Sequence, residues 1–388
     1  MKRHTRLQRL AHEEDGFSLV FVGLGFMAFL AVSMLAIDVG MLMTARSQAQ
    51  NSADAGALAG ATALVYNDWN DRSASGPAVT NALGAGRGNQ VMGGTVSVNP
   101  TDVTFPLAPD GQNNRVKVDV FRDSSRGNPI PTLIAQYFGI ATVGVNATAT
   151  AEASPADAMT CVLPFTIPDR WKEVQDASFD PNNSSFDIYA DKKGTPMSNP
   201  DIYIGPGDKA NYTGYRADLD KGTLVRLKAD NATKVAPSFY YPYAIPASTG
   251  ASDYREAIGH CNTTIMEFGQ TYNPEPGNMV GPTQQGMDDL IALDPDAYWD
   301  ESKQKVVSSK NPSPRVRALP LFDPQYYAEG KQNSRNASLK FVNYLGFFIE
   351  KMQGGEIYGR ITPIGGLRNG NATGAPPAAF PKAIRLVQ

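Results

Sequence analysis

Few residues of this 388-residue chain could carry catalysis. His260 could act as a general base, but no nucleophile is marked near it, and its neighbour Cys261 is of more use in a disulfide. Acidic runs at 180–187 and 294–301 could offer oxygen ligands to Ca²⁺, yet neither has the spacing of a known calcium loop. The motifs G-x-S-x-G, G-x-x-x-x-G-K-[ST], H-E-x-x-H and C-x-x-C are missing. We therefore predict no catalytic residue, no metal site and no cofactor.

Composition excludes further classes of function. The 35 Lys and Arg residues stand against 38 Asp and Glu, a net charge of -3, which supplies no basic field for binding phosphates. The three histidines are too few for a His-rich metal site. Neither nucleic acid nor a small-molecule substrate is expected as a partner. With 42% hydrophobic residues, the length allows two or three domains with proper cores.

The chain contains two cysteines, Cys161 and Cys261. They are too few for a zinc cluster and too far apart for a local redox pair, but they suit one long-range disulfide. Such a bond requires an oxidising compartment. The sequence around them contains an aromatic run at 239–243, which fits a buried strand better than a sugar-binding surface.

One segment is long and apolar enough to cross a membrane. No residue from 16 to 37 is charged, and at about 1.5 Å per residue this segment crosses a ~30 Å hydrocarbon core. The basic residues before it are Lys2, Arg3, Arg6 and Arg9, whereas the first one after it is Arg46. The positive-inside rule then places the N-terminus in the cytoplasm and the bulk of the chain outside the membrane.

Three interpretations of this segment remain open. It could be a cleaved secretory signal with a weak site at Ala31-Val32-Ser33. It could be a prepilin-type leader processed between Gly16 and Phe17, although Phe21 stands where such leaders carry Glu. We expect an uncleaved anchor, because the helical pattern continues past the membrane.

Beyond the span, the Ala-rich sequence predicts that the helix continues to about Tyr66. Small residues at i, i+4 spacing allow close approach of another element, which is either this chain's own downstream domain or a partner's matching helix. They are Ala45, Ala49, Ala53, Ala57 and Ala61, with Ser52, Gly56 and Gly60 beside them. Asp38 is interpreted as an interfacial carboxylate, with a pairing role in a helix assembly as the alternative.

Residues 36–40 (AIDVG) and 48–61 (QAQNSADAGALAGA) resemble the N-terminal signature of the TadE/TadG-like proteins of Tad (Flp) pilus assembly, and TadG-like proteins most closely. This resemblance implies a helix-packing and assembly role for Asp38, Ala49, Ala53, Asp54, Gly56, Ala57, Gly60 and Ala61. Segments 161–165 and 167–171 resemble the exported part of longer members, as does a motif made by Gly277, Asn278, Gly281, Pro282, Thr283 and Gly286. Longer members often carry a von Willebrand type A domain with a D-x-S-x-S metal motif, but residues 176–180 (DASFD) have Asp in place of its second Ser, so they do not support metal-dependent adhesion.

The predicted fold is α+β. We expect a cytoplasmic basic segment at 1–16 and a transmembrane helix at 17–43. A helix extension with a small pilin-like α+β module follows at 44–153, and a β-rich exported domain at 154–388. Within the module, a short helix is predicted at 131–138. The exported domain is expected to contain one internal helix, at 284–293 with Thr283 as its N-cap, and a mobile tail after residue 365.

The function implied is that of a non-enzymatic, single-pass component of the bacterial inner membrane. Its exported part would contact other Tad pilus or secretion proteins, and its helix would contact inner-membrane lipid. An envelope-anchored protein that recognises a surface polymer is the alternative, and an anchored hydrolase is a distant third.

Overall fold

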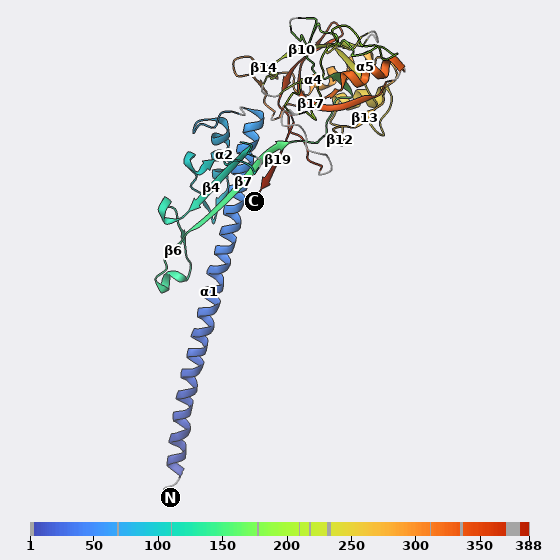
Figure 1. Cartoon of the computed structure of the whole chain (residues 1–388). Helices are drawn as coiled ribbons and strands as arrows, with labels where there is room; N and C mark the ends of the chain where they lie inside the picture. The colour runs from blue at the N-terminus through green and yellow to red at the C-terminus, as the bar shows by residue number, and fades with distance from the viewer. Residues whose placement is uncertain are drawn as a thin grey trace. The chain divides into compact units, whose positions relative to one another are not determined.

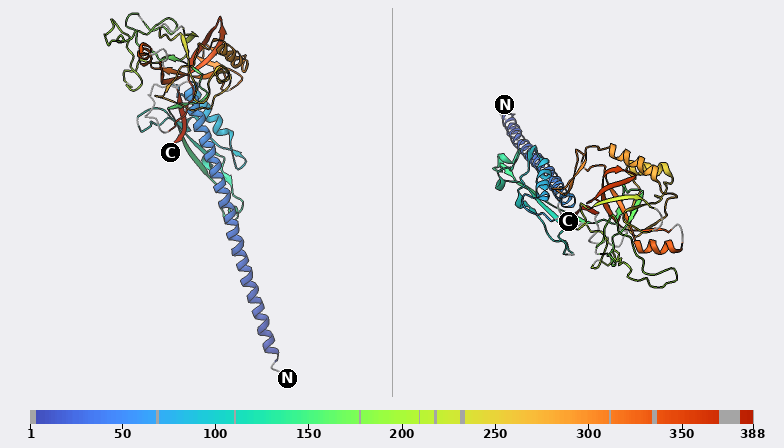
Figure 2. Two further views of the ribbon diagram at one scale, coloured as in Figure 1. Left: turned by 90° about the vertical axis from the view of Figure 1, so that its right-hand side faces the viewer. Right: turned by 90° about the horizontal axis from the view of Figure 1, so that it is seen from above.

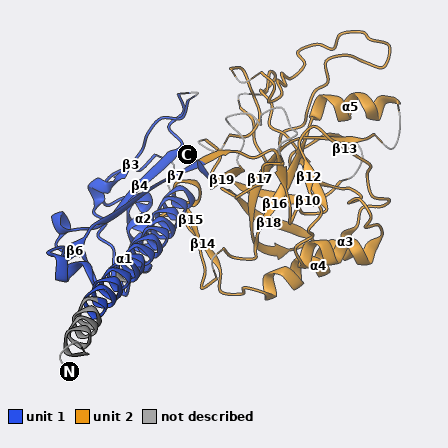
Figure 3. Ribbon diagram, turned by 90° about the horizontal axis from the view of Figure 1, so that it is seen from below, with its two compact units in different colours: residues 1–63, 70–152, 386–388 blue, residues 64–69, 153–385 orange. Residues whose placement is uncertain are grey.

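The computed structural model describes residues 4–67, 70–109, 111–176, 178–208, 210–216, 219–230, 234–310, 312–333, 337–369 and 381–387, and no side chains for 4–17 or Met34. The chain forms two compact units, shown in different colours in Figure 3. Unit 1 comprises residues 1–63, 70–152 and 386–388, and unit 2 comprises 64–69 and 153–385.

Unit 1 is built on one long helix, α1 (His4–Tyr66), in which no proline interrupts the backbone hydrogen bonds. A second helix, α2 (Pro77–Gly88), begins with proline, whose missing N–H costs nothing at that position. Figures 1 and 2 show α2 and strands β4 and β7 beside the C-terminal half of α1, whereas no other described element of the unit lies along its N-terminal half. The two halves of α1 therefore have different surroundings.

A four-stranded sheet has the order β19-β7-β4-β3. Unit 1 contributes β3 (Val103–Thr104), β4 (Arg115–Arg122) and most of β7 (Val145–Pro155), whereas most of β19 (Lys382–Val387) belongs to unit 2. Apolar and polar residues alternate along β4, so that Val116, Val118 and Val120 are buried on one face. The short elements are β1 (Gln90–Val91), β2 (Gly94–Thr95), β5 (Ile130–Pro131), β6 (Thr142–Val143) and the 3₁₀ turns η1 (Pro100–Asp102), η2 (Ser124–Arg126) and η3 (Ala135–Phe138).

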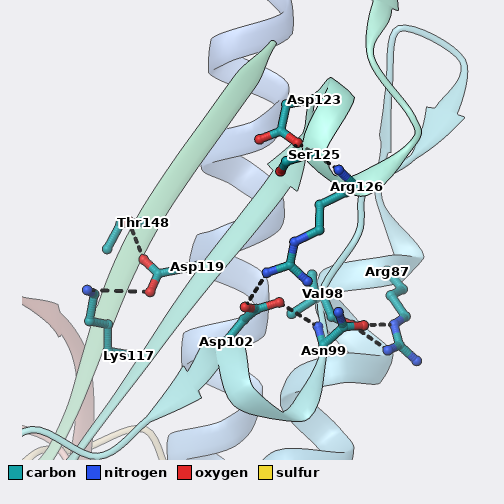
Figure 4. Close-up of polar contacts among 10 residues, drawn as sticks. All are labelled: Arg87, Val98, Asn99, Asp102, Lys117, Asp119, Asp123, Ser125, Arg126 and Thr148. Atoms are coloured by element: carbon teal, nitrogen blue, oxygen red, sulfur yellow. Dashed lines mark hydrogen bonds and ion pairs between the residues drawn. The ribbon is translucent and has the colours of Figure 1, made fainter.

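Polar contacts hold the connections of this sheet in place (Figure 4). Arg126 Nη2 donates to Asp102 Oδ1 at 2.6 Å, and the other carboxylate oxygen of Asp102 accepts from the backbone N–H of Asn99 at 2.8 Å. The Arg87 guanidinium, near the end of α2, donates to the backbone carbonyl of Val98. These contacts join α2, η1 and η2 into one module.

Unit 2 contains a seven-stranded sheet of order β13-β17-β16-β9-β11-β10-β18. Because β18 pairs with both β10 and β17, six of these strands close into a barrel, which leaves them without a free edge. Its strands are β9 (Phe165–Pro168), β10 (Leu224–Ala229), β11 (Phe239–Pro242), β16 (Val316–Phe322), β17 (Leu339–Gln353) and β18 (Glu356–Thr362), with β13 (Thr271–Tyr272) paired to β17. Two-stranded pairs are formed by β8 (Ala158–Met159) with β12 (Met266–Glu267) and by β14 (Tyr298–Asp300) with β15 (Lys305–Val307).

The core of unit 2 is rich in aromatic side chains. The ring of Tyr243 meets that of Phe341 edge-on at 4.8 Å between centroids, and Trp171 and Phe165 are fully buried. The aromatic run at 239–242 forms β11, and all four residues are buried. The predicted α+β class, with a long N-terminal helix followed by a β-rich region, is confirmed.

Several local predictions were wrong. The described part of unit 2 contains three helices instead of one: α3 (Ala251–Gly259), α4 (Val280–Ala292) and α5 (Pro324–Asn333). Helix α3 has nine residues and no side-chain cap, so it lacks a local start signal, although Tyr254, Ala257 and Ile258 are buried at helical spacing. In α5 only Pro324 and Tyr327 are buried, which gives it a weak apolar period. Helix α4 begins before Thr283, which therefore lies within the helix and is not its N-cap.

Two further expectations also need correction. The helix predicted at 131–138 is the single 3₁₀ turn η3, preceded by strand β5, because Pro131 joins a strand pair instead of starting a helix. The tail was predicted to be mobile, but residues 382–387 form β19, whose place in the sheet beside β7 is a tertiary contact without a local signal. Residues 370–380 of that tail lie outside the described residues.

Candidate functional site

The N-terminal half of α1 presents apolar side chains in every direction. Within the described segment Ser18–Tyr66, its most apolar window has a mean hydropathy of 2.5 and is not buried by any part of the chain. Consecutive residues Leu19, Val20, Phe21 and Val22 are all exposed, although they point to different sides of the helix. A helix that is apolar all round is stable only inside a protein core or a membrane.

The C-terminal half of α1 is covered by its own unit. A Cβ added at Gly60 would lie 2.8 Å from Val116 Cγ1, and one at Gly56 would lie 3.1 Å from the carbonyl oxygen of Ala82. Ser52 donates a hydrogen bond to the carbonyl of Gly86. The fully buried small residues on this face are Ala45, Ala49, Ala53, Ala57 and Ala61. Of the two occupants expected for this face, the structure places the chain's own α2 and β4 there.

Asp54, on the same half of the helix, is half-buried and accepts a hydrogen bond from Gln50 Nε2 at 2.8 Å. The same amide group also donates to the carbonyl of Thr148 in β7 at 3.1 Å. The pair therefore lies at the contact between helix and sheet.

Asp38 contacts a segment far away in the sequence. Its carboxylate accepts hydrogen bonds from three successive backbone N–H groups, those of Leu133 (2.9 Å), Ile134 (3.1 Å) and Ala135 (2.6 Å). These groups open the 3₁₀ turn η3, where the backbone donors would otherwise lack partners. Although the adjoining helical residues are exposed, Asp38 is itself buried. Sequence reasoning found Asp38 but missed its partners, which lie in a stretch without charged residues from 127 to 151.

Gly16 and Phe17, the residues of the possible processing site, belong to α1. Their side chains lie outside the part that the structure describes.

Cys161 and Cys261 form the predicted disulfide, across a sequence separation of 100. The bond uses the sulfur beside His260, so no thiol is available there as a nucleophile. His260 and Cys261 line an open hollow of about 310 Å³ together with Asp253 and Glu256. Among the described residues, no three His, Cys, Asp or Glu side chains are grouped closely enough to hold a metal ion.

The motif at 277–286 forms the contact between α3 and α4. Gly286 lies against α3, where an added Cβ would be 2.8 Å from Ile258 Cβ. Thr283 Oγ1 donates to the hydroxyl of Tyr254 at 3.1 Å. Gly277 precedes the helix with a φ of +85°, which favours glycine. Pro282 is half-buried, whereas Asn278 and Gly281 are exposed. Packing therefore explains Thr283 and Gly286, and backbone conformation explains Gly277, but neither explains Asn278 or Gly281.

Unit 2 also contains a buried carboxylate, that of Asp169. It accepts hydrogen bonds from the hydroxyls of Tyr212 (2.8 Å) and Tyr203 (3.2 Å) and from the backbone N–H of Tyr215 (3.0 Å). Complete burial outweighs these donors and raises the pKa of Asp169 to about 7. The group fixes the loops that carry the three tyrosines.

Comparison with known families agrees with the geometry of unit 1. The model of a family described as putative Flp pilus-assembly TadE/G-like matches residues 16–63, and that of a family described as putative Tad-like Flp pilus-assembly matches residues 43–151. The chain matches no curated protein and no solved structure. The resemblance to TadE/G-like proteins is thus confirmed over residues 16–63, which include Asp38, and the match to the Tad-like family extends the similarity to Tad pilus-assembly proteins through η3 to residue 151. These matches support a role in pilus assembly. The resemblance of the motif at 277–286 stays a prediction, because it lies beyond both matches.

Proposed function

We propose that this protein is a non-enzymatic, single-pass component of the bacterial inner membrane that acts in Tad (Flp) pilus assembly or secretion. One observation carries the proposal: the same helix, α1, exposes an apolar surface over its N-terminal half and packs its small residues on a folded module over its C-terminal half. The first half suits lipid, and the second fixes the module rigidly to the anchor.

The orientation follows from the flanking charge. The four basic residues before the span favour a cytoplasmic N-terminus, so that unit 2 and the part of unit 1 after the span lie on the periplasmic side. The disulfide suits that compartment. The exported units would there contact pilus or secretion-channel subunits. A non-enzymatic role is supported because the sulfur next to His260 is used in the bond.

A deletion strain tests the pilus role. We expect it to lose surface pili, counted by electron microscopy, and to regain them when the intact gene is supplied. The helix α2 variant Gly84→Ala, which meets no atom within 4 Å, should restore pili equally well and controls for expression of a variant. Normal pili in the deletion strain would refute the proposal.

Labelling with a membrane-impermeant maleimide tests the topology. The native cysteines are bonded to each other, so a cysteine introduced in place of Thr5 or Leu107 would be the reactive thiol. In intact spheroplasts we expect labelling of the Leu107→Cys variant alone, with Thr5→Cys labelled only after lysis. The reverse pattern contradicts the orientation. N-terminal sequencing should find the uncleaved chain, whereas a mature N-terminus at Phe17 would replace the anchor by a processed, pilin-like protein.

A further inference from the structure

A short segment of unit 1 exposes large apolar side chains that the proposed function does not use. Between β5 and β6, Leu133 is 55% exposed, Tyr137 81%, Phe138 69% and Ile140 53%. We call residues 133–140 the apolar loop. No charged residue occurs between Arg126 and Glu152, so the loop itself carries no charge. A contiguous exposed apolar patch of this kind marks an interaction site.

The position of the loop along α1 is fixed by Asp38. Three hydrogen bonds join the beginning of the loop to this carboxylate, so the loop lies at the level of residue 38 (Figure 1, beside β6). Asp38 lies five positions before Met43, where the apolar run of the helix ends, which is about 7.5 Å along the axis. The interfacial layer on each side of a bilayer is roughly 5–8 Å thick. The loop is thus held at the height at which an anchored α1 would leave the membrane.

Backbone N–H groups of the apolar loop donate hydrogen bonds within the protein, so they do not depend on water as a partner. The N–H groups of residues 133, 134 and 135 are bonded to Asp38. Those of Tyr137, Gly139 and Ile140 donate to carbonyls within the loop at 3.0–3.1 Å. At its edge, the hydroxyl of Thr132 donates to the carbonyl of Ile140 at 2.5 Å. Since each unpaired backbone group in hydrocarbon costs several kcal/mol, this internal pairing lowers the cost of contact with lipid.

We propose that the apolar loop is a second membrane contact of the protein, whose four large side chains enter the interfacial layer of the leaflet through which α1 leaves the bilayer. We assign lipid as the partner of the loop because the helix beside it also exposes apolar side chains. Ile37 and Val39, on either side of Asp38, are both exposed. Tyrosine and other aromatic residues are enriched at this depth. The loop and the helix together would fix the tilt of the module relative to the membrane plane.

This inference rests on the proposed anchoring of α1, and one experiment separates the two. Full-length protein carrying one introduced cysteine is labelled with the fluorophore NBD without reductant, which leaves the native disulfide intact. It is then reconstituted into phosphatidylethanolamine–phosphatidylglycerol vesicles containing lipid with a nitroxide at acyl carbon 5. The labelled variants are Tyr137→Cys in the loop, Leu35→Cys in the span and Leu107→Cys as the control.

Leu107 is matched to the loop because it is a large apolar residue, 62% exposed, in the same unit. It precedes Arg115, at the end of β4 opposite to the loop, and the eight residues of β4 extend over about 24 Å. We expect the nitroxide to remove roughly half of the emission at positions 35 and 137 and to leave position 107 unchanged.

Quenching at 35 without quenching at 137 would overturn the loop proposal and leave the anchor standing. Loss of quenching at both positions would show that α1 does not enter the bilayer, which overturns the anchoring and the loop contact together. Equal quenching at 137 and 107 would also refute the proposal, because it would show that the whole module, and not the loop, lies against lipid.

Discussion

The carboxylate oxygen Oδ2 of Asp38 accepts a hydrogen bond from the backbone N–H of Ala135 at 2.6 Å, across 97 residues of sequence. The first residue belongs to the apolar helix and the second begins the turn η3. A carboxylate that accepts several backbone N–H groups makes charge-assisted hydrogen bonds, which are stronger than neutral ones. This contact ties one end of the module's sheet to α1.

Replacement of Asp38 should therefore release the apolar loop. In the Asp38→Ala variant three backbone N–H groups lose their acceptor, so the beginning of the loop should open more often. Hydrogen exchange of the full-length protein in detergent should show faster exchange at residues 133–135, with little change in α2. The matched variant Asp54→Asn removes a carboxylate from the same helix whose partner is a side chain, and it should leave the loop protected. Unchanged exchange in Asp38→Ala would contradict the role assigned to this carboxylate.

The close contact at Gly60 predicts a second effect on stability. Gly60→Val would place a Cβ 2.8 Å from Val116 Cγ1 and 3.2 Å from Ala82 Cβ, which forces the helix and the sheet apart. We expect a loss of about 1–3 kcal/mol and a lower Tm of the full-length protein. Gly84→Ala, in α2 with no neighbour within 4 Å, should instead gain up to about 1 kcal/mol from helix propensity. Equal Tm values for the two variants would show that the packing at Gly60 is loose.

The disulfide predicts a stability effect in unit 2. Cysteines separated by 100 residues close a long loop, so the double variant Cys161→Ser/Cys261→Ser should lose about 2–5 kcal/mol. Chemical denaturation of the full chain measures this difference. Mass mapping of protein exported to the periplasm should find the two cysteines linked without added oxidant. Detection of free thiols at both positions would disprove the bond in the native protein.

The buried carboxyl group of Asp169 should make the free energy of unfolding depend on pH. Its folded pKa of about 7 lies above the ordinary value of 3.8, so the folded state binds more protons than the unfolded state between these values. The stabilising contribution is complete below about pH 4 and is lost as the pH rises towards 7, with a slope of at most about 1.4 kcal/mol per pH unit. Thermal unfolding of Asp169→Asn should show a shallower slope, because burial also raises the pKa of Asp201, to about 6, and that contribution remains.

The control for that measurement is Asp300→Asn. Hydrogen bonding from Ser302 lowers the pKa of Asp300 to about 2, so its own effect on stability falls below the window from pH 4 to pH 7. If Asp169→Asn and the unaltered protein show the same slope across that window, another group is responsible for it.

Local sequence patterns were sufficient to predict the elements in which the pattern is strong. The uninterrupted apolar and Ala-rich run predicted α1, alternation predicted β4, and the presence of only two cysteines predicted their bond. Helix α3 escaped prediction because it is short and begins without a side-chain cap, and α5 because only two of its residues are buried, which weakens its apolar period. The strand β19 escaped it because a Gly- and Pro-rich stretch precedes it and its sheet partner is far away in the sequence.

The sequence by itself determined the membrane-length helix, its flanking charges, the small residues on its outer half and the resemblance to TadE/G-like proteins, since each of these is a local pattern along one element. Only the tertiary structure decided what the small residues pack against, how six strands close into a barrel, and which groups Asp38 binds. The reason is physical. Every residue except proline carries a backbone N–H donor, so the sequence does not show which donors bind Asp38. The contact forms only when the sheet brings residues 133–135 beside the helix.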